Sequence, residues 1–423
     1  MENVKVSLPG PDDITREVLS NGITILTRSN FNSPSVVVTG YFGVGALMDP
    51  DDKLGLAEYT SYALMRGTRT RTFDKIYNEL ESVGASLGFS SGVHTSGFNA
   101  RSLVEDLPLL LKLLSESLIT PAFPKVEMDK LRAQLLTGLS IRAQDTSDMA
   151  SMVFDQILFK GHPYSRPEDG YPETVQKIKR ADLLKFHRDY YGPRGMVIAI
   201  VGAVTADEAI KQVKRALGGW QVNGQKEATP LPELKLLKKT VSRHHHIPGK
   251  SQSDLVIGTN GPRRRDPEYM SASLGNNVLG QFGMMGRIGD VVREKSGLAY
   301  YAYSSISAGT GPGSWEVSAG VNPQNLKRAS DLIQDELKRF VQEGVTDEEL
   351  ADSKANFIGR LPLSLESNGG VANALINIER HQLGLNYYRN YAALVRNVSR
   401  EDVLSAARKF IDVNRLAIAI AGP

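Results

Sequence analysis

The pattern of apolar and polar positions predicts short strands separated by groups of amphipathic helices. Apolar runs bounded by turn residues predict strands at 22–26, 35–42 and 253–258. Apolar residues at helical spacing predict helices at about 54–66, 73–84, 105–119, 124–144 and 147–159, and near 267–280, 325–343 and 347–360. Strands with helices grouped between them indicate an α+β fold.

A second pattern repeats itself at an offset of 220 residues. The helix-like segment 180–190 matches 400–410, and the apolar run 198–202 matches 418–422 without a gap. In each copy an amphipathic helix leads into a buried strand that ends at Gly. The chain is therefore predicted to hold two copies of one domain, residues 1–220 and 241–423, joined by an exposed linker at 221–240.

Composition narrows the possible functions. The 423 residues are too many for one ordinary core, and the net charge is only +3. No basic block is interleaved with aromatic residues, so nucleic acid is not an expected partner. The absence of cysteine excludes disulfides, thiolate zinc sites and cysteine nucleophiles.

No apolar run is long enough to cross a bilayer, so no membrane partner is expected. The first residues also lack the apolar core of a secretory signal. The expected location is cytoplasmic. The alternative is a periplasmic or secreted protein whose leader has been removed.

The segment from Gly55 to Thr68, G-L-A-E-Y-T-S-Y-A-L-M-R-G-T, carries the most informative helix pattern. A core-facing side is predicted for Leu56, Tyr59, Ala63 and Leu64, and a helix end at Gly67. The spacing i, i+3, i+4 places Glu58, Ser61 and Tyr62 together on the other face. These residues alone describe an ordinary amphipathic helix with a polar outer side.

The frame G-L-A-x-x-x-x-x-x-L-x-R-G-T resembles the signature of the pitrilysin and mitochondrial-processing-peptidase family. In that family the polar face reads H-x-x-E-H, in which two histidines bind zinc and the glutamate activates water. The resemblance places Glu58, Ser61 and Tyr62 at those positions, and Thr137 or Gly138 at the third ligand, a glutamate. It implies vestigial metal positions and no cofactor bound by this chain.

A second resemblance lies in the segment 291–303. Gly297 is predicted to end a helix that carries Arg293, and a strand carrying Tyr300 follows. The spacing resembles the family's R-x-x-x-x-x-x-Y element, whose side chains donate hydrogen bonds near the scissile carbonyl. Arginine stays charged and tyrosine is a neutral donor, so both suit a developing oxyanion. The alternative interpretation is a surface ion pair for Arg293 and sheet packing for Tyr300.

The resemblance extends over most of the chain. Gly161-His162-Pro163-Tyr164 is similar to the family's H-P-Y turn, and residues 343–350 are similar to a helix entry in which Thr346 and Glu349 form a capping box. It implies two homologous α/β-sandwich domains of the inverted zincin type in a clam-shell arrangement.

Three functional hypotheses follow. The leading one is a non-catalytic subunit of a heteromeric zinc metallopeptidase, in which a homologous H-x-x-E-H partner carries the zinc and this chain supplies Arg293 and Tyr300 toward a peptide substrate. A second is a purely structural or peptide-binding homologue. A third is a self-sufficient enzyme with new ligands. The only histidine cluster is His244-His245-His246, of which His244 and His246 would share one face of a strand.

Overall fold

The computed structural model describes residues 8–228, 230–283 and 285–423. Residues 1–7, Thr229 of the predicted linker and Met284 lie outside these ranges. The prediction that the first residues lack a secretory signal therefore falls partly on residues that are not described. The chain forms two compact units. Unit 1 contains the described residues of Met1–Leu139, Pro167–Pro230 and Pro362–Arg389, and unit 2 contains those of Ser140–Arg166, Leu231–Leu361 and Asn390–Pro423.

Unit 1 is built on a six-stranded sheet with the order β1-β2-β6-β3-β5-β4. Its strands are β1 (Thr15–Val18), β2 (Thr24–Ser29), β3 (Ser35–Phe42), β4 (Ser86–Ser91), β5 (Ser96–Leu103) and β6 (Val197–Gly202). The pair β2 and β6 is parallel, and all the other neighbours are antiparallel. Every residue of β6 is buried, as its continuous apolar run requires for a strand covered on both faces.

Unit 2 repeats this topology with the order β7-β11-β8-β10-β9. Its strands are β7 (Val241–His246), β8 (Ser253–Asn260), β9 (Ala299–Ser307), β10 (Ser314–Val321) and β11 (Ala417–Gly422). The pair β7 and β11 is parallel, like β2 and β6 of unit 1, and the other neighbours are antiparallel. Because strand order and direction agree at each of these five positions, the predicted internal duplication is confirmed.

The predicted helices are present with small shifts at their ends. They are α1 (Leu56–Ala63), α2 (Phe73–Glu81), α3 (Leu107–Ile119), α4 (Lys125–Arg142), α5 (Thr146–Leu158), α7 (Arg180–Tyr190), α9 (Tyr269–Gly280), α11 (Leu326–Glu343), α12 (Asp347–Ser364) and α15 (Arg400–Phe410). Further helices are α6 (Pro172–Lys177), α8 (Ala206–Leu217), α10 (Gly286–Gly289), α13 (Asn368–His381) and α14 (Tyr387–Arg396). Among the described residues, no helix combines the length and hydropathy that a membrane span needs.

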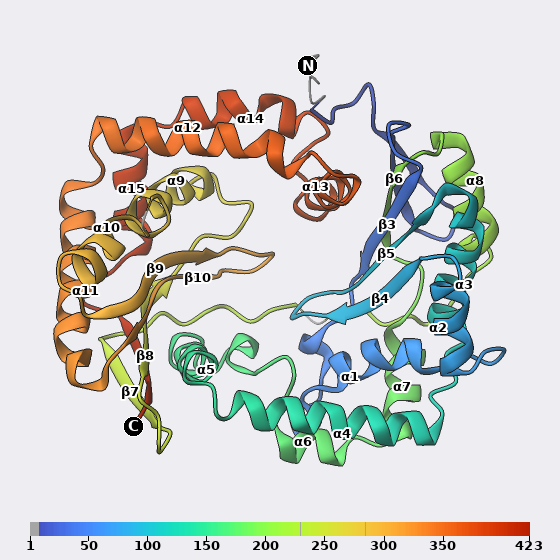
Figure 1. The fold of residues 1–423 in the computed structure, drawn as a ribbon, viewed down its shortest axis with the longest axis horizontal. Coiled ribbons are helices and arrows are strands. Elements are labelled where there is room, and N and C mark those ends of the chain that lie inside the picture. The colour runs from blue at the N-terminus through green and yellow to red at the C-terminus, as the bar shows by residue number, and fades with distance from the viewer. Residues whose placement is uncertain (1–7, 229, 284) are drawn as a thin grey trace. The chain divides into compact units, whose positions relative to one another are not determined.

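Each sheet is covered on both faces, and one cover comes from the other half of the sequence. In unit 1, α3 and α8 lie on one side of the sheet and α13 packs on β3 and β6 from the other (Figure 1). In unit 2, α9, α11 and α15 form one layer and α5 packs on β8 and β11 opposite them. The two compact units therefore differ from a division of the chain at 221–240, because α5 and α13 are exchanged.

A buried carboxylate holds the beginning of α5 against the unit 2 sheet. Asp254 of β8 is 1% exposed and accepts hydrogen bonds from the hydroxyls of Thr146 and Tyr301. The Gln252 side-chain amide donates to the same carboxylate at 3.0 and 3.1 Å. Burial, and then the hydrogen bond to Asp254, raise the pKa of Tyr301. The phenol therefore remains a donor across the ordinary pH range.

The equivalent end of α13 in unit 1 is held by an amide. Asn368 donates to the backbone oxygen of Ser35 at 3.2 Å and to its hydroxyl at 3.1 Å. It also accepts a hydrogen bond of 2.7 Å from Asn30. The two exchanged helices are thus fixed at the same end by different chemistry.

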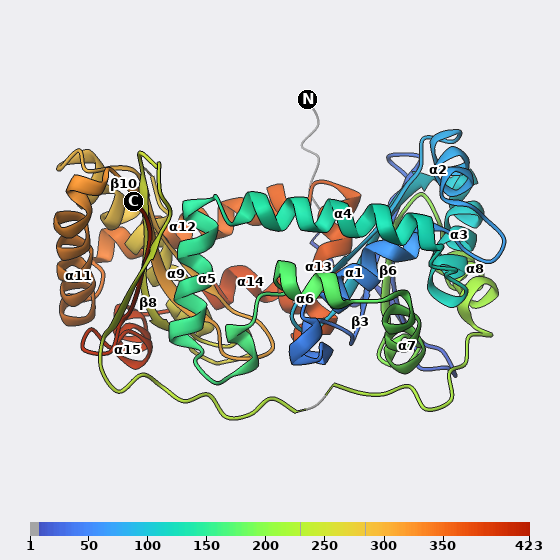
Figure 2. The same cartoon turned by 90° about the horizontal axis from the view of Figure 1, so that it is seen from below.

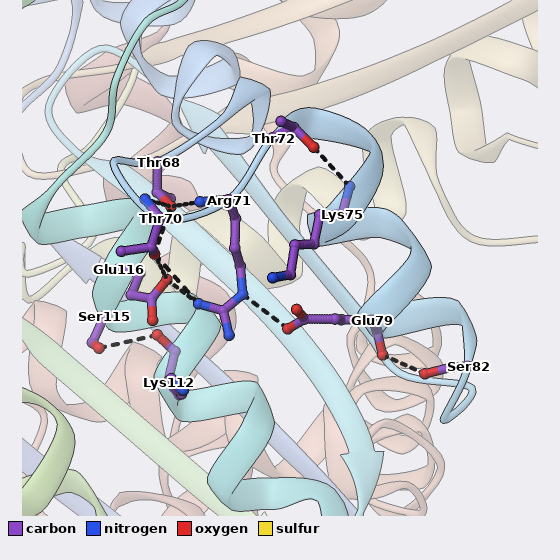
Figure 3. Close-up of polar contacts among 10 residues, drawn as sticks. All are labelled: Thr68, Thr70, Arg71, Thr72, Lys75, Glu79, Ser82, Lys112, Ser115 and Glu116. Atoms are coloured by element: carbon purple, nitrogen blue, oxygen red, sulfur yellow. Dashed lines mark hydrogen bonds and ion pairs between the residues drawn. The ribbon is translucent and has the colours of Figure 1, made fainter.

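A polar cluster fixes the chain between α1 and the following helices of unit 1 (Figure 3). Arg71 binds Glu79 of α2 at 2.9 Å and also pairs with Glu116 of α3. The Thr70 hydroxyl donates to Glu116 at 2.8 Å. Burial acts to raise the pKa of Glu116, but the hydrogen bonds from Arg71 and Thr70 outweigh it and lower that pKa.

Replacing Asp254 by Ala is expected to lower the free energy of unfolding by about 3 kcal/mol, because it leaves buried hydroxyl and amide donors without an acceptor. Thr146→Val removes one donor only, and we expect a loss of about 1 kcal/mol. Urea unfolding measures both. Equal stability of Asp254→Ala and the parent chain would contradict the anchoring role.

Arg71→Met is expected to cost about 2–3 kcal/mol at neutral pH, because two partly buried carboxylates lose their charged donor. Since the folded pKa of Glu116 is lowered, this contribution is complete above the usual glutamate pKa of about 4.3 and disappears as the pH falls through the lower folded value. Urea unfolding at pH 7 and pH 3 tests both statements. Arg188→Met, at a side chain that is 73% exposed, is the matched control.

Candidate functional site

The helix α1 begins at a backbone turn that only glycine accommodates easily. Gly55 has a φ of +93°, and a Cβ there would lie 2.7 Å from the backbone oxygen of Asp169. The buried Asp49 carboxylate accepts hydrogen bonds from the backbone N–H groups of Gly55 at 2.9 Å and Ala57 at 2.8 Å. A negative charge at this end also suits the helix dipole.

The apolar side of α1 is buried as predicted, and Gly67 follows the end of the helical segment. The opposite side is less uniform than the spacing suggested. Glu58 is partly buried, Tyr62 is 39% exposed and Ser61 is 0% exposed. The prediction that all three share a polar outer face was therefore wrong for Ser61, because neighbouring parts of unit 1 cover that position.

The Ser61 hydroxyl has no hydrogen-bond partner among the described residues. Burial raises the pKa of Tyr62, and the carboxylates of Glu58 and Asp169 raise it further. Tyr62 is therefore a neutral phenol beside acidic groups. The three positions offer one carboxylate, one enclosed hydroxyl and one phenol.

The remaining position that the sequence resemblance marks, Gly138, lies on α4, which runs beside α1 (Figure 2). The two helical segments are joined by a hydrogen bond of 2.5 Å from the Tyr59 hydroxyl to the Met128 backbone oxygen. Gly138 is exposed, and a Cβ built there meets nothing within 4 Å. A glutamate side chain would fit at this position without a clash. The carboxylate is therefore missing because the residue is glycine and not because the fold excludes a side chain.

These residues do not suit a zinc ion. Zinc sites in proteins use imidazole, thiolate and carboxylate ligands, and a catalytic site needs three of them. Of the four positions only Glu58 carries such a group. Within the described ranges, no group of three or more His, Asp or Glu residues is arranged to hold a metal.

Arg293 lies in one turn of π-helix, Asp290–Glu294, that continues α10. Gly297, with a φ of +62°, donates its N–H to the Arg293 backbone oxygen at 2.9 Å and turns the chain into β9. The predicted helix end at Gly297 is therefore confirmed. The Arg293 side chain is 34% exposed, and its guanidinium lies 3.6 Å from the Glu294 carboxylate. Such an exposed pair is weak, so it leaves most donor positions of Arg293 accessible.

Tyr300 lies near the start of β9, the terminal strand of the unit 2 sheet. It is 64% exposed, whereas Ala302 and Ser304 further along the strand are fully buried. No hydrogen bond from its hydroxyl is recorded within the described chain. The alternative in which Tyr300 packs within the sheet does not fit this exposure.

The other sequence motifs have structural roles in their own units. Thr346 and Glu349 form the predicted capping box, with backbone-to-side-chain hydrogen bonds of 2.7 and 3.2 Å. The His162 ring accepts a hydrogen bond from the N–H of Tyr164 at 3.2 Å. His244 and His246 share one face of β7, with ring centroids 6.5 Å apart. Two imidazoles alone leave the usual ligand number of zinc incomplete.

Comparison with known proteins finds the same family along most of the chain. Residues 24–167 match the family described as Insulinase (Peptidase family M16), and residues 177–357 match the Peptidase M16 inactive domain. The chain is 27% identical to an uncharacterized zinc protease of Streptomyces coelicolor, over 98% of this chain and 90% of that protein. It is 25% identical to an uncharacterized zinc protease of Bacillus subtilis, over 84% of this chain and 85% of that protein.

Solved structures agree in fold. A peptidase M16 inactive domain from Pseudomonas fluorescens matches with a TM-score of 0.90 and 26% identity, over 97% of this chain and 98% of the other. A protease from Helicobacter pylori matches with a TM-score of 0.91 over 98% of this chain and 100% of the other, and at 18% identity it supports the fold alone. The resemblance seen in the sequence is confirmed, and the chain belongs to peptidase family M16, the pitrilysin family.

Proposed function

We propose that this chain is the non-catalytic subunit of a two-chain zinc peptidase of family M16. A homologous partner with H-x-x-E-H would hold the zinc, and this chain would contribute Arg293 and Tyr300. The proposal rests on a difference between the two units in the functional side chains that each one carries. Unit 1 lacks the side chains for a metal, whereas unit 2 presents two accessible hydrogen-bond donors.

The state of α1 supports the first part of the proposal. A peptidase helix of this kind needs two imidazoles and a carboxylate on one accessible face. Here Ser61 is fully buried and Tyr62 is a neutral phenol whose pKa is raised by burial and by nearby carboxylates. Ser61 stands where the motif has its glutamate, and Tyr62 stands where it has its second histidine. Neither residue can replace that group, so the chain alone would not activate water by this route.

The exposure of Arg293 and Tyr300 supports the second part. The guanidinium supplies a fixed positive charge with several N–H donors, and the phenol supplies one neutral donor. A peptide carbonyl becomes more negative as a nucleophile adds to it. Donors placed beforehand at that oxygen stabilise the transition state more than the ground state. This role requires the two side chains to remain free of strong partners in their own unit.

The test is a peptide-cleavage assay with a purified H-x-x-E-H subunit of the same family, alone and with this chain. The full pair is expected to cleave, and Arg293→Ala or Tyr300→Phe in this chain is expected to lower kcat about 100- to 1,000-fold, as for other lost oxyanion donors. Complex formation, followed by size-exclusion chromatography, should not change.

Two matched variants guard against indirect effects. Tyr303→Phe removes a hydroxyl from an exposed tyrosine on the same strand, and Arg328→Ala removes an exposed arginine from α11. Both are expected to keep full activity. A partner that is fully active alone and insensitive to both donor variants would overturn the proposal and favour the structural or peptide-binding alternative.

Metal analysis tests the division of labour independently of activity. The purified chain is expected to hold no stoichiometric zinc, whereas the pair is expected to hold one zinc ion, which is lost when the partner's histidines are replaced. Ser61→Ala should leave this result unchanged and is expected to stabilise unit 1 by up to about 1 kcal/mol, because it removes an unpartnered buried hydroxyl. Stoichiometric zinc in the isolated chain that disappears in His244→Ala would contradict the proposal.

A further inference from the structure

Unit 1 contains a pocket of about 530 Å³ between α13 and the face of the sheet on which α13 packs. Its floor comes from β3, β4 and β5, and its wall comes from the last two turns of α13. All of its lining residues belong to unit 1. Neither the vestigial metal positions nor the Arg293 and Tyr300 element line it.

The floor is open because the strand residues there are small. Gly88 and Ser90 of β4 and Gly97 of β5 line the pocket, together with the largely buried Phe89 and Phe98 beside them. A Cβ built on Gly88 meets nothing within 4 Å. The space beside β4, the terminal strand of the sheet, is therefore large enough for a ligand side chain.

Arg380 supplies a permanent positive charge among the pocket residues, which also include His381. Its guanidinium lies 4.4 Å from the ring centroid of Tyr41, which holds the planar group in place. Burial lowers the pKa of Arg380, although the interaction with Tyr41 opposes this effect. The side chain is nevertheless accessible to solvent. It is a positive group on the solvent-exposed side of the pocket.

No carboxylate in the described part of unit 1 is recorded in an ion pair with Arg380. The adjacent Glu379 carboxylate is occupied, because Arg16 binds it through two hydrogen bonds of 3.0 and 2.7 Å. Around Arg380 the pocket instead presents the amides of Asn99, Asn373 and Asn377. Asn377 donates to the Tyr388 hydroxyl at 3.0 Å, which fixes the orientation of its amide.

We propose that this pocket binds a carboxylate of an extended peptide, with Arg380 as its counter-ion and the asparagine amides as further donors. A guanidinium fork matches the two oxygens of a carboxylate, and the pocket offers no competing acid. The carboxylate can be the C-terminus of the peptide or an Asp or Glu side chain. The inference rests on the proposed function only in taking a peptide as the ligand.

The position of the pocket suits a peptide in particular. Gly88 and Ser90 belong to β4, whose outer edge has no neighbouring strand in the sheet of unit 1. An extended peptide that pairs with such an edge places alternate side chains on one face of the sheet. A side chain or chain end directed to the face that bears α13 would enter the pocket and reach Arg380.

The test measures binding to the full chain alone by fluorescence anisotropy. Three labelled ten-residue peptides with otherwise neutral side chains are compared: one with a free C-terminus, its amidated form, and the amidated form with a central Glu. At least one of the two carboxylate-bearing peptides is expected to bind about tenfold more tightly than the neutral peptide. The peptide that shows the gain identifies the source of the carboxylate.

The same gain is expected to disappear in Arg380→Gln and to persist in Arg188→Gln, which removes an exposed arginine from α7. Gly88→Leu should abolish the gain by filling the pocket, and the open space around its Cβ predicts normal folding. This variant keeps the test valid if Arg380→Gln does not fold. Circular dichroism and thermal melting verify the fold of each variant.

Equal affinity of the three peptides, absence of binding by all of them, or a gain that survives in both pocket variants would overturn the inference. The failure of the proposed function is distinguishable, because the binding assay contains no partner subunit. In that case the Arg380 dependence would persist while Arg293→Ala left the partner's cleavage rate unchanged.

Discussion

The structure depends on the burial of both faces of two central strands by helices from opposite halves of the sequence. β6 is buried along its whole length and β11 nearly so. Apolar strands of this kind are stable only when a layer covers each face. One layer in each unit is local in sequence, and the other is α13 in unit 1 or α5 in unit 2. Asn368 and Asp254 then fix where these helices begin.

The two units share one topology but have diverged in what their surfaces offer. In unit 1 the helix α1 retains its fold because Asp49, Gly55 and the buried side chains maintain it. None of these residues lies at the positions that the family's metal motif occupies, so the helix fold does not depend on metal ligands. In unit 2 the turn at Gly297 places an accessible arginine before a terminal strand with an accessible tyrosine. The residues that maintain each fold are thus different from the residues proposed to act on a substrate.

Much of this could be predicted from the sequence, because helical periodicity and the 220-residue repeat are local signals. The cores of α1 and α15, the turn at Gly297 and the cap at Thr346 follow from side chains a few residues apart. The exchange of α5 and α13 could not be predicted, since periodicity shows which face of a helix is apolar and not which sheet covers it. The burial of Ser61 and the surroundings of Arg380 were hidden for the same reason: their neighbours are distant in sequence.

The exchange of helices also determines when each unit can be completed during synthesis. When the ribosome has completed β6, the unit 1 sheet still lacks α13, which follows only at Asn368–His381. The faces of β3 and β6 that α13 covers therefore stay open until this helix has been made, with apolar surface available to other nascent chains. Unit 1 becomes complete only after α13 has been synthesised. This delay is a consequence of topology and not of weak packing.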